Sequence, residues 1–103
     1  MDQNIQNQVG LFTIKLSQLM REYYTTKFSN LAVPKLEVKF GKKYAKIIKV
    51  DNQRSVHSFI NLSNGDILMA ASWNAPAKHA RGNIFDANCG VGTAVTVYGA
   101  RYL

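Results

Sequence analysis

The sequence is short of cysteine and of acidic residues, and each shortage excludes a class of protein. Cys89 is the only cysteine among 103 residues, so no disulfide can form within the chain and a reducing, intracellular compartment is expected. Six Asp and Glu stand against 13 Lys and Arg, which gives a formal net charge of +7. Such a balance leaves few carboxylates for acid–base catalysis and favours anionic partners.

Long apolar runs are also lacking. No run approaches the roughly 18 residues of a membrane span, and the opening MDQNIQNQVG lacks the basic segment and apolar core of a signal peptide. We therefore expect no membrane partner and a cytoplasmic location. The length predicts one domain, residues 1–103, and a hydrophobic content of 47% is ordinary for a globular chain.

The N-terminal segment, residues 1–30, carries the pattern of a long helix. Its apolar residues are spaced alternately by four and three, at Ile5, Val9, Phe12, Leu16, Leu19 and Tyr23. This spacing predicts one helical face that packs on a core. Leu11 and Met20 are expected to widen that face, and the helix should fade before Pro34.

After Pro34 the hydrophobic period changes from that of a helix to that of a strand. Residues 35–73 predict an antiparallel meander of four strands, because short turns such as GKK and SNGD join them. Residues 74–92 are expected to form a wrapping loop, and residues 93–99 the last strand. The predicted fold class is α+β, with one long N-terminal helix packed on an antiparallel sheet of about five strands. A curled, barrel-like sheet plus the helix is the alternative.

Residues with reactive side chains are few and scattered. His57, His79, Asp86 and Cys89 could supply a nucleophile, a base and an orienting group. The sequence contains no nucleophile elbow, phosphate loop, dinucleotide fingerprint or metal-binding His pair. We therefore predict no catalytic residue, no metal site and no cofactor.

Most of the positive charge lies between residues 35 and 54. Strand alternation should place several of these lysines on the sheet face opposite the helix, where their spacing suits a phosphate backbone. Tyr44, His57 or Phe59 could add base stacking. The alternative is a solvated face whose lysines deter edge-to-edge aggregation. The cations are Lys35, Lys39, Lys42, Lys43, Lys46, Lys49 and Arg54.

The stretch SWNAPAKHARGNIFD, residues 72–86, has little hydrophobic periodicity. We interpret Trp73 as a core anchor, Pro76 as a strand stop and Gly82 as a turn. Lys78 and Arg81 are not required by that geometry, so the stretch predicts a connector that displays cations to an anion.

Together these patterns predict a small basic module that binds nucleic acid or another polyanion without catalysis. Its phosphate contacts are expected from Lys42, Lys43, Lys46, Lys78 and Arg81. The rival hypothesis is a protein-interaction or structural module that self-associates into a homo-oligomer, through sheet edges or the long helix, or that inhibits a host protein.

The segments SVHSFINLSNGDILMAASWNAPAKHARGNIFD and VYGARYL resemble a group of small uncharacterised proteins found in tailed-phage and environmental, largely marine, viral sequences. The shared pattern spans the C-terminal two-thirds of the chain, and its most distinctive part reads ASW-x-APAK-x-ARGN. This resemblance implies a viral or metagenomic source and the cytoplasm of an infected bacterial host. It adds support for nucleic-acid contact by association alone, because the group has no established activity.

Overall fold

The computed structural model describes residues 3–28 and 30–101. Helix α1 (Gln3–Lys27) precedes five strands, which are β1 (Lys35–Phe40), β2 (Tyr44–Val50), β3 (Arg54–Asn61), β4 (Asp66–Ala70) and β5 (Pro76–Asn83). A 3-10 turn, η1 (Ala87–Gly90), then leads to the two-residue strands β6 (Val95–Thr96) and β7 (Gly99–Ala100). Residues 1–2 and 29, which belong to the predicted helical segment 1–30, lie outside the described residues.

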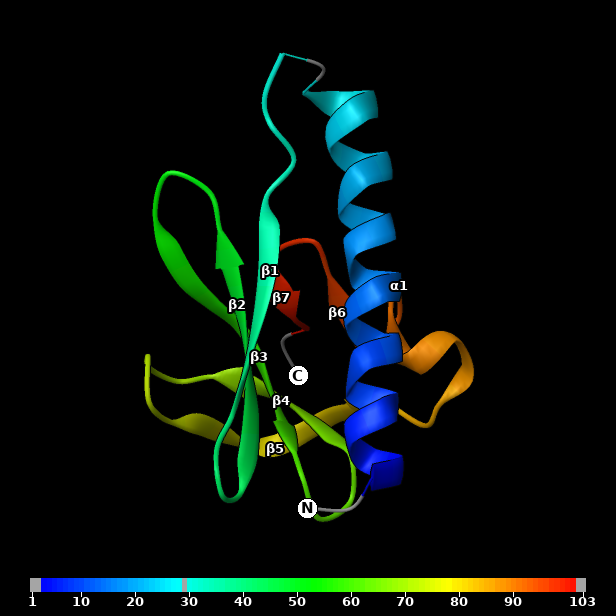
Figure 1. Ribbon diagram of the computed structural model, residues 1–103, viewed down its shortest axis with the longest axis vertical. Coiled ribbons are helices and arrows are strands. Elements are labelled where there is room, and N and C mark those ends of the chain that lie inside the picture. The colour runs from blue at the N-terminus through cyan, green and yellow to red at the C-terminus, as the bar shows by residue number, and fades with distance from the viewer. Residues whose placement is uncertain (1–2, 29, 102–103) are drawn as a thin grey trace.

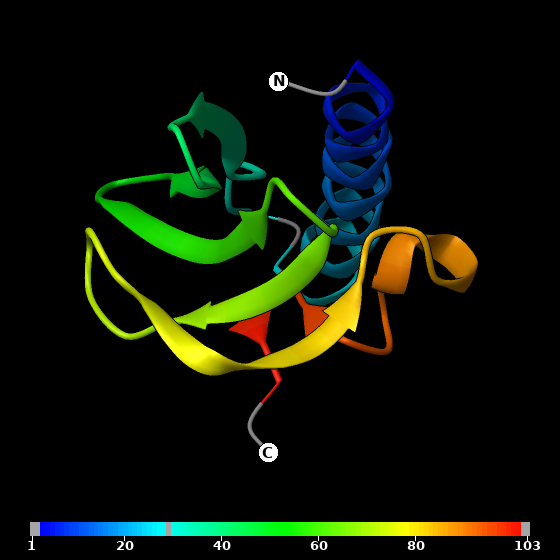
Figure 2. The same cartoon turned by 90° about the horizontal axis from the view of Figure 1, so that it is seen from below.

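The five long strands form one antiparallel sheet in the order β1-β2-β3-β4-β5. Figure 2 shows this sheet curling, so that β4 and β5 turn back toward α1. The curl does not close, because β1 and β5 remain the two edges. The predicted α+β class is confirmed, and the sheet is not a closed barrel.

Helix α1 runs alongside β1 and covers the inner face of the curled sheet (Figure 1). Its buried residues are Ile5, Val9, Phe12, Leu16 and Met20. Leu19 and Tyr23, the other two residues of the predicted apolar face, are partly buried against the same core. Leu11 was expected to widen this face, but its side chain is 42% exposed, because its position on the helix turns it away from the sheet. No helix in the described part of the chain combines the length and apolarity that a membrane crossing requires.

The C-terminal segment completes the core from inside the curl. Strand β7 contacts β3 and β4, while η1 contacts α1 and β5. Ile84, Val91, Val95 and Val97 are all buried there, against the helix face and the inner side of the sheet. The core therefore has three contributors, since the short C-terminal strands fill the space that helix and sheet leave between them.

The prediction of a wrapping loop at residues 74–92 is wrong for residues 76–83, because these form the edge strand β5. Pro76 is the first residue of this strand, where its missing N–H is tolerated. Two irregularities in the β4–β5 register break the alternation of side chains, so the hydrophobic pattern of a strand is absent. Gly82 makes no turn, since it lies within β5, where an added Cβ would overlap the Cβ of Ala94.

Two further strand predictions need correction. The fourth strand was expected to continue to Trp73, but β4 ends at Ala70. The last strand was expected at residues 93–99, and the structure has instead the paired strands β6 and β7. Gly99, with φ at 146°, adopts a conformation open mainly to glycine, so the chain folds back there.

Candidate nucleic-acid interface

Four lysines gather where β1 turns into β2. Lys39 and Lys46 lie opposite each other in the β1–β2 register, and Lys42 and Lys43 are exposed in the turn between the strands. They share a groove of about 280 Å3, here called the lysine groove, lined by Lys39, Phe40, Gly41, Lys42, Lys43, Tyr44, Lys46, Phe59 and Asn74.

Trp73 borders this groove through a contact with Lys46. The Lys46 Nζ lies 4.5 Å from the centroid of the Trp73 ring and donates a hydrogen bond of 3.2 Å to Asn74 Oδ1. An ammonium this close to the ring gains cation–π attraction. Trp73 was predicted to be a core anchor, but 44% of it is exposed, because β4 ends before it and the following turn carries it outward.

Phe59 forms the apolar floor of the groove. The strand register aligns Lys39, Lys46, Phe59 and Leu68 across four neighbouring strands, so their side chains share one face. The Lys46 Nζ lies 6.0 Å from the Phe59 ring centroid, and the Tyr44 ring packs edge-on at 6.1 Å. Phe59 is only 3% exposed, so the expectation that it stacks on a base is wrong.

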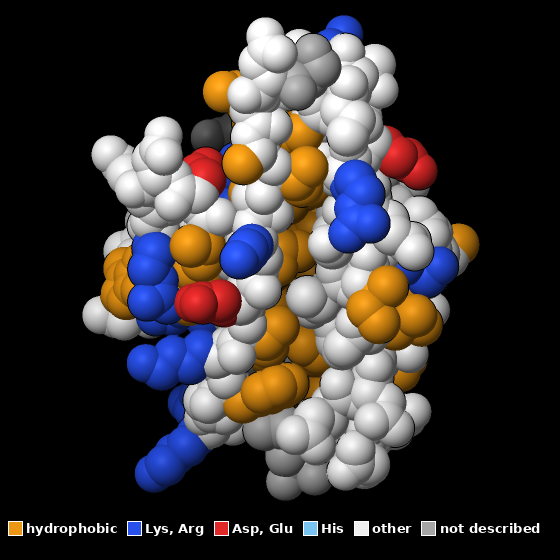
Figure 3. Space-filling view, turned by 45° about the horizontal axis from the view of Figure 1, so that its top comes forward, with side chains coloured by type: hydrophobic (Ala, Val, Ile, Leu, Met, Phe, Trp, Pro, Cys, Tyr) orange, Lys and Arg blue, Asp and Glu red, His pale blue; other side chains and the backbone are white. Residues whose placement is uncertain are grey.

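The charge of the groove is not balanced by carboxylates. Among the described residues, the one ion pair joins Arg54 to Glu37 with 2.6 Å between Nη2 and Oε1. A second hollow, of about 530 Å3, adjoins the groove and shares Gly41, Lys42, Lys43 and Tyr44 with it. Figure 3 shows Lys and Arg side chains gathered over the β1–β2 side of the molecule, interleaved with hydrophobic ones.

Lys78 and Arg81, the other predicted contacts, lie on β5 and do not line the groove. Lys78 is exposed. Arg81 is half-buried, and its guanidinium bonds to its own chain: Nε donates to the Arg101 carbonyl at 2.8 Å, Nη1 donates to the His79 carbonyl, and Nη2 lies 3.6 Å from Met69 Sδ. The structure thus brings together Lys42, Lys43 and Lys46, and separates Lys78 and Arg81 from them.

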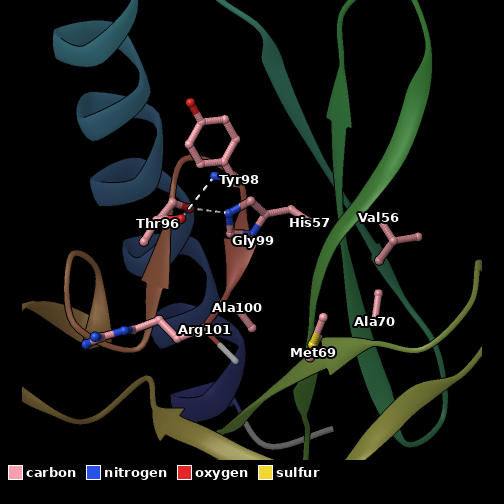
Figure 4. A pocket seen from close by; sticks show the side chains of 9 residues that line it. All are labelled: Val56, His57, Met69, Ala70, Thr96, Tyr98, Gly99, Ala100 and Arg101. Carbon is pink, nitrogen blue, oxygen red and sulfur yellow. Dashed lines mark hydrogen bonds between the residues drawn. The ribbon is translucent and has the colours of Figure 1, made fainter. Parts of the chain in front are cut away.

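His57 faces a different hollow, of about 430 Å3, between β3, β4 and the β6–β7 pair (Figure 4). Its Nε2 donates a 2.7 Å hydrogen bond to the Thr96 carbonyl, and its Nδ1 lies 3.0 Å from Ser58 Oγ. The pKa of His57 is lowered to about 4, chiefly because burial desolvates the ring; the Thr96 hydrogen bond opposes this shift, and the nearby Lys49 adds to it. His57 was a stacking candidate, but it is 3% exposed and both ring nitrogens are engaged.

The other residues considered for catalysis do not converge on His57. His79 is exposed on β5, and Asp86 Oδ2 accepts a 3.0 Å hydrogen bond from the Asn83 backbone N–H. Cys89 is buried, with Gln8 Nε2 3.6 Å from its Sγ, and burial raises the pKa of its thiol. Within the described part of the chain, no three His, Cys, Asp or Glu side chains are grouped so as to hold a metal.

The predicted contacts omitted several residues that line the groove or border it. Lys39, Phe40, Gly41 and Asn74 line it, and Trp73 borders it through Lys46. Lys39 could have been found, since it precedes Lys46 by seven residues and a tight turn joins their two strands. Such a hairpin sets the two lysines opposite each other. Trp73 had no such signal, because the contact with Lys46 depends on where β4 ends.

The fold and the groove together define a small α+β module with a basic, partly aromatic surface. Over residues 1–98 the sequence matches a family described as "Family of unknown function (DUF7717)", and the chain belongs to that family. Comparisons with curated proteins and with solved structures gave no match.

Proposed function

We propose that the chain is a non-catalytic module that binds single-stranded nucleic acid along the lysine groove. Lysines supply the sequence-independent part of such binding by neutralising phosphates. Exposed aromatic rings beside them add stacking, which prefers single strands because their bases are free. Lys42, Lys43 and Lys46 are the proposed phosphate contacts, with Trp73 as the stacking ring.

The observation that carries the proposal is the position of Lys46. Its ammonium lies 4.5 Å from the centroid of the Trp73 ring and 6.0 Å from that of Phe59, and Lys46 pairs with Lys39 across the β1–β2 ladder. Like charges directly opposite on a sheet destabilise it. A surface that keeps four uncompensated lysines around one groove is therefore better suited to an anion than to water alone.

The test is fluorescence anisotropy of labelled single-stranded and duplex oligonucleotides, titrated with protein at several salt concentrations. We expect micromolar binding to single strands that weakens steeply with salt, with each lost phosphate contact lowering the logarithmic salt slope by about 0.7. The double variant Lys42→Gln, Lys43→Gln should lower that slope by about 1.4.

The matched control is Arg21→Gln, Lys27→Gln, which removes the same net charge from exposed positions on α1. If the two double variants weaken binding equally, the positive charge acts diffusely and the groove is not the site. If the parent binds no oligonucleotide at low salt, the lysines are a solvated face and the rival, a module that acts on a host protein, gains support.

Lys78 and Arg81 remain proposed as secondary contacts. Lys78→Gln should lower the salt slope by about 0.7 if a strand extends from the groove to β5. Arg81 keeps one N–H on each of Nη1 and Nη2 beyond its internal bonds, so a phosphate contact would use those two. The resemblance to viral proteins supports a setting in the cytoplasm of an infected host.

A further inference from the structure

Strand β1 offers an unpaired edge with a defined hydrogen-bonding phase. In the sheet order its single neighbour is β2. The Gly41 N–H donates to the Tyr44 carbonyl at 2.8 Å, and these two residues lie opposite each other if the β1–β2 register is continued. Because bonded and non-bonded pairs alternate along an antiparallel ladder, the backbone groups of Leu36, Val38 and Phe40 point to the open edge.

An apolar groove of about 430 Å3 runs beside this edge, between β1 and α1. Figure 3 shows hydrophobic side chains along it, between the ridges of helix and strand. Ile14 and Phe40 border it and are 58% and 39% exposed, and a Cβ added at Gly10 would meet nothing within 4 Å. Both the edge and the groove therefore lack a covering element within the described chain.

We propose that a second copy of this chain pairs with β1 through its own β1, antiparallel, with Val38 opposite Val38 of the second copy. This register joins the two sheets into one. It sets the edge-pointing backbone groups of both strands opposite each other, so that they can exchange hydrogen bonds. It also brings Leu36 against Phe40 of the second copy, on the groove side.

The charges of β1 select this register. With Val38 at the centre, Glu37 lies opposite Lys39 of the second copy, and symmetry makes that pair twice. A shift of one strand by two residues, which is the smallest that keeps the hydrogen-bonding phase, sets Glu37 against Glu37 or Lys39 against Lys39. Like charges directly opposite are destabilising. The pattern is thus self-complementary in one register, which favours a second copy over a foreign strand.

The proposal does not depend on nucleic-acid binding. Lys42, Lys43 and Lys46 lie in the turn and on β2 and take no part in the joint, so a dimer would carry two lysine grooves. Lys39 and Phe40 belong both to the joint and to the lining of the groove. A protein that dimerises but binds no oligonucleotide would keep this inference and refute the proposed function.

The test is analytical ultracentrifugation of the free protein from about 1 µM to 1 mM, at physiological salt. We expect a monomer–dimer equilibrium in this range. Lys39→Glu and Glu37→Lys should each weaken the dimer about tenfold or more, because each makes two opposite-charge pairs repulsive. An equimolar mixture of the two variants should restore it, since every altered pair then joins unlike charges.

The control is Lys35→Glu, which makes the same charge change on the same strand but lies opposite Gly41 in the proposed register. It should weaken the dimer much less than Lys39→Glu does. This comparison remains decisive if Glu37→Lys, which also loses the Arg54 ion pair, fails to fold. A monomer at about 1 mM, equal effects of Lys35→Glu and Lys39→Glu, or a mixture of two folded variants that stays monomeric would each overturn the proposal.

Discussion

Phe59 and His57 lie two residues apart on β3, yet they serve opposite sides of the sheet. Phe59 contacts Lys46 on the solvent-facing lysine groove, whereas His57 bonds Thr96 of β6 inside the curl. Two residues apart on a regular strand would share a face. The β2–β3 register explains the exception, because Ile47 pairs with Ser58 and Ile48 with Val56, which leaves His57 as the extra residue of a bulge.

The two faces of the sheet therefore differ in how far they desolvate an ionisable side chain. The inner side desolvates His57 and holds its pKa at about 4, so the ring is neutral near pH 7. The outer side leaves Lys42 and Lys43 exposed, where an ammonium keeps its hydration at little cost. Because of the bulge, β3 contributes His57 to the packed interior and Phe59 to the base of the lysine groove. The predictions below test this contrast.

The largest expected effect is a loss of stability in acid that depends on His57. Its folded pKa of about 4 lies below the ordinary value of 6.5, so the stabilisation is present above pH 6.5 and is lost as the pH falls toward 4. Over that interval the unfolded chain binds a proton that the folded chain excludes, and the free energy of unfolding should fall by up to about 3 kcal/mol. Urea denaturation across this range measures it.

The control compares His57→Gln with His79→Gln. The first should flatten the acid dependence, whereas the second, at an exposed position on β5, should keep the dependence of the parent. Equal pH dependence in the two variants would contradict the assignment to His57.

A slightly smaller effect is expected from Gly82→Ala on the inner side. A Cβ there would overlap that of Ala94, and overpacking of this kind costs about 1–3 kcal/mol. Chemical denaturation should show the loss, and adding Ala94→Gly should recover part of it, because the two sites are coupled. Additive losses in the double variant would show that the contact is not the cause.

On the outer side, Trp73→Ala should separate binding from stability. Loss of a stacking ring weakens single-strand binding by about 1–3 kcal/mol. The free energy of unfolding should fall by only about 1 kcal/mol or less, because the half-exposed ring loses little beyond its cation–π contact with Lys46. Anisotropy titration and denaturation of the same samples measure both, with Trp73→Phe as the control that keeps a ring. A large loss of stability with unchanged binding would show that Trp73 stabilises the fold and does not stack on nucleic acid.

The smallest expected effect is a gain. Gly10→Ala lies in the helix interior, where nothing stands within 4 Å of the added Cβ, and alanine is favoured over glycine there by about 0.5–1 kcal/mol. Denaturation at low protein concentration should show this rise. A fall in stability that occurs only at high protein concentration would indicate that a second molecule of the protein packs against Gly10.

Local pattern was enough wherever a residue's role follows from its spacing. The four–three repeat predicted α1 and most of its buried face, since helical geometry fixes which side chains share a side. Alternation and turn residues predicted β1 to β3, and the lysines followed from their places on those strands. β5 was missed because an irregular edge strand that begins with Pro76 has neither the alternation nor the apolar content of a strand.

Tertiary structure decided the features that depend on contacts between distant segments. Trp73 reaches Lys46 only because β4 stops at Ala70, and His57 turns inward only because β3 carries a bulge opposite Ile47. The sequence by itself determined the helix, the sheet and the number of cations. Which cations share a groove, and whether His57 faces the interior, depended on the register between strands, because a shift of one residue moves a side chain to the other face.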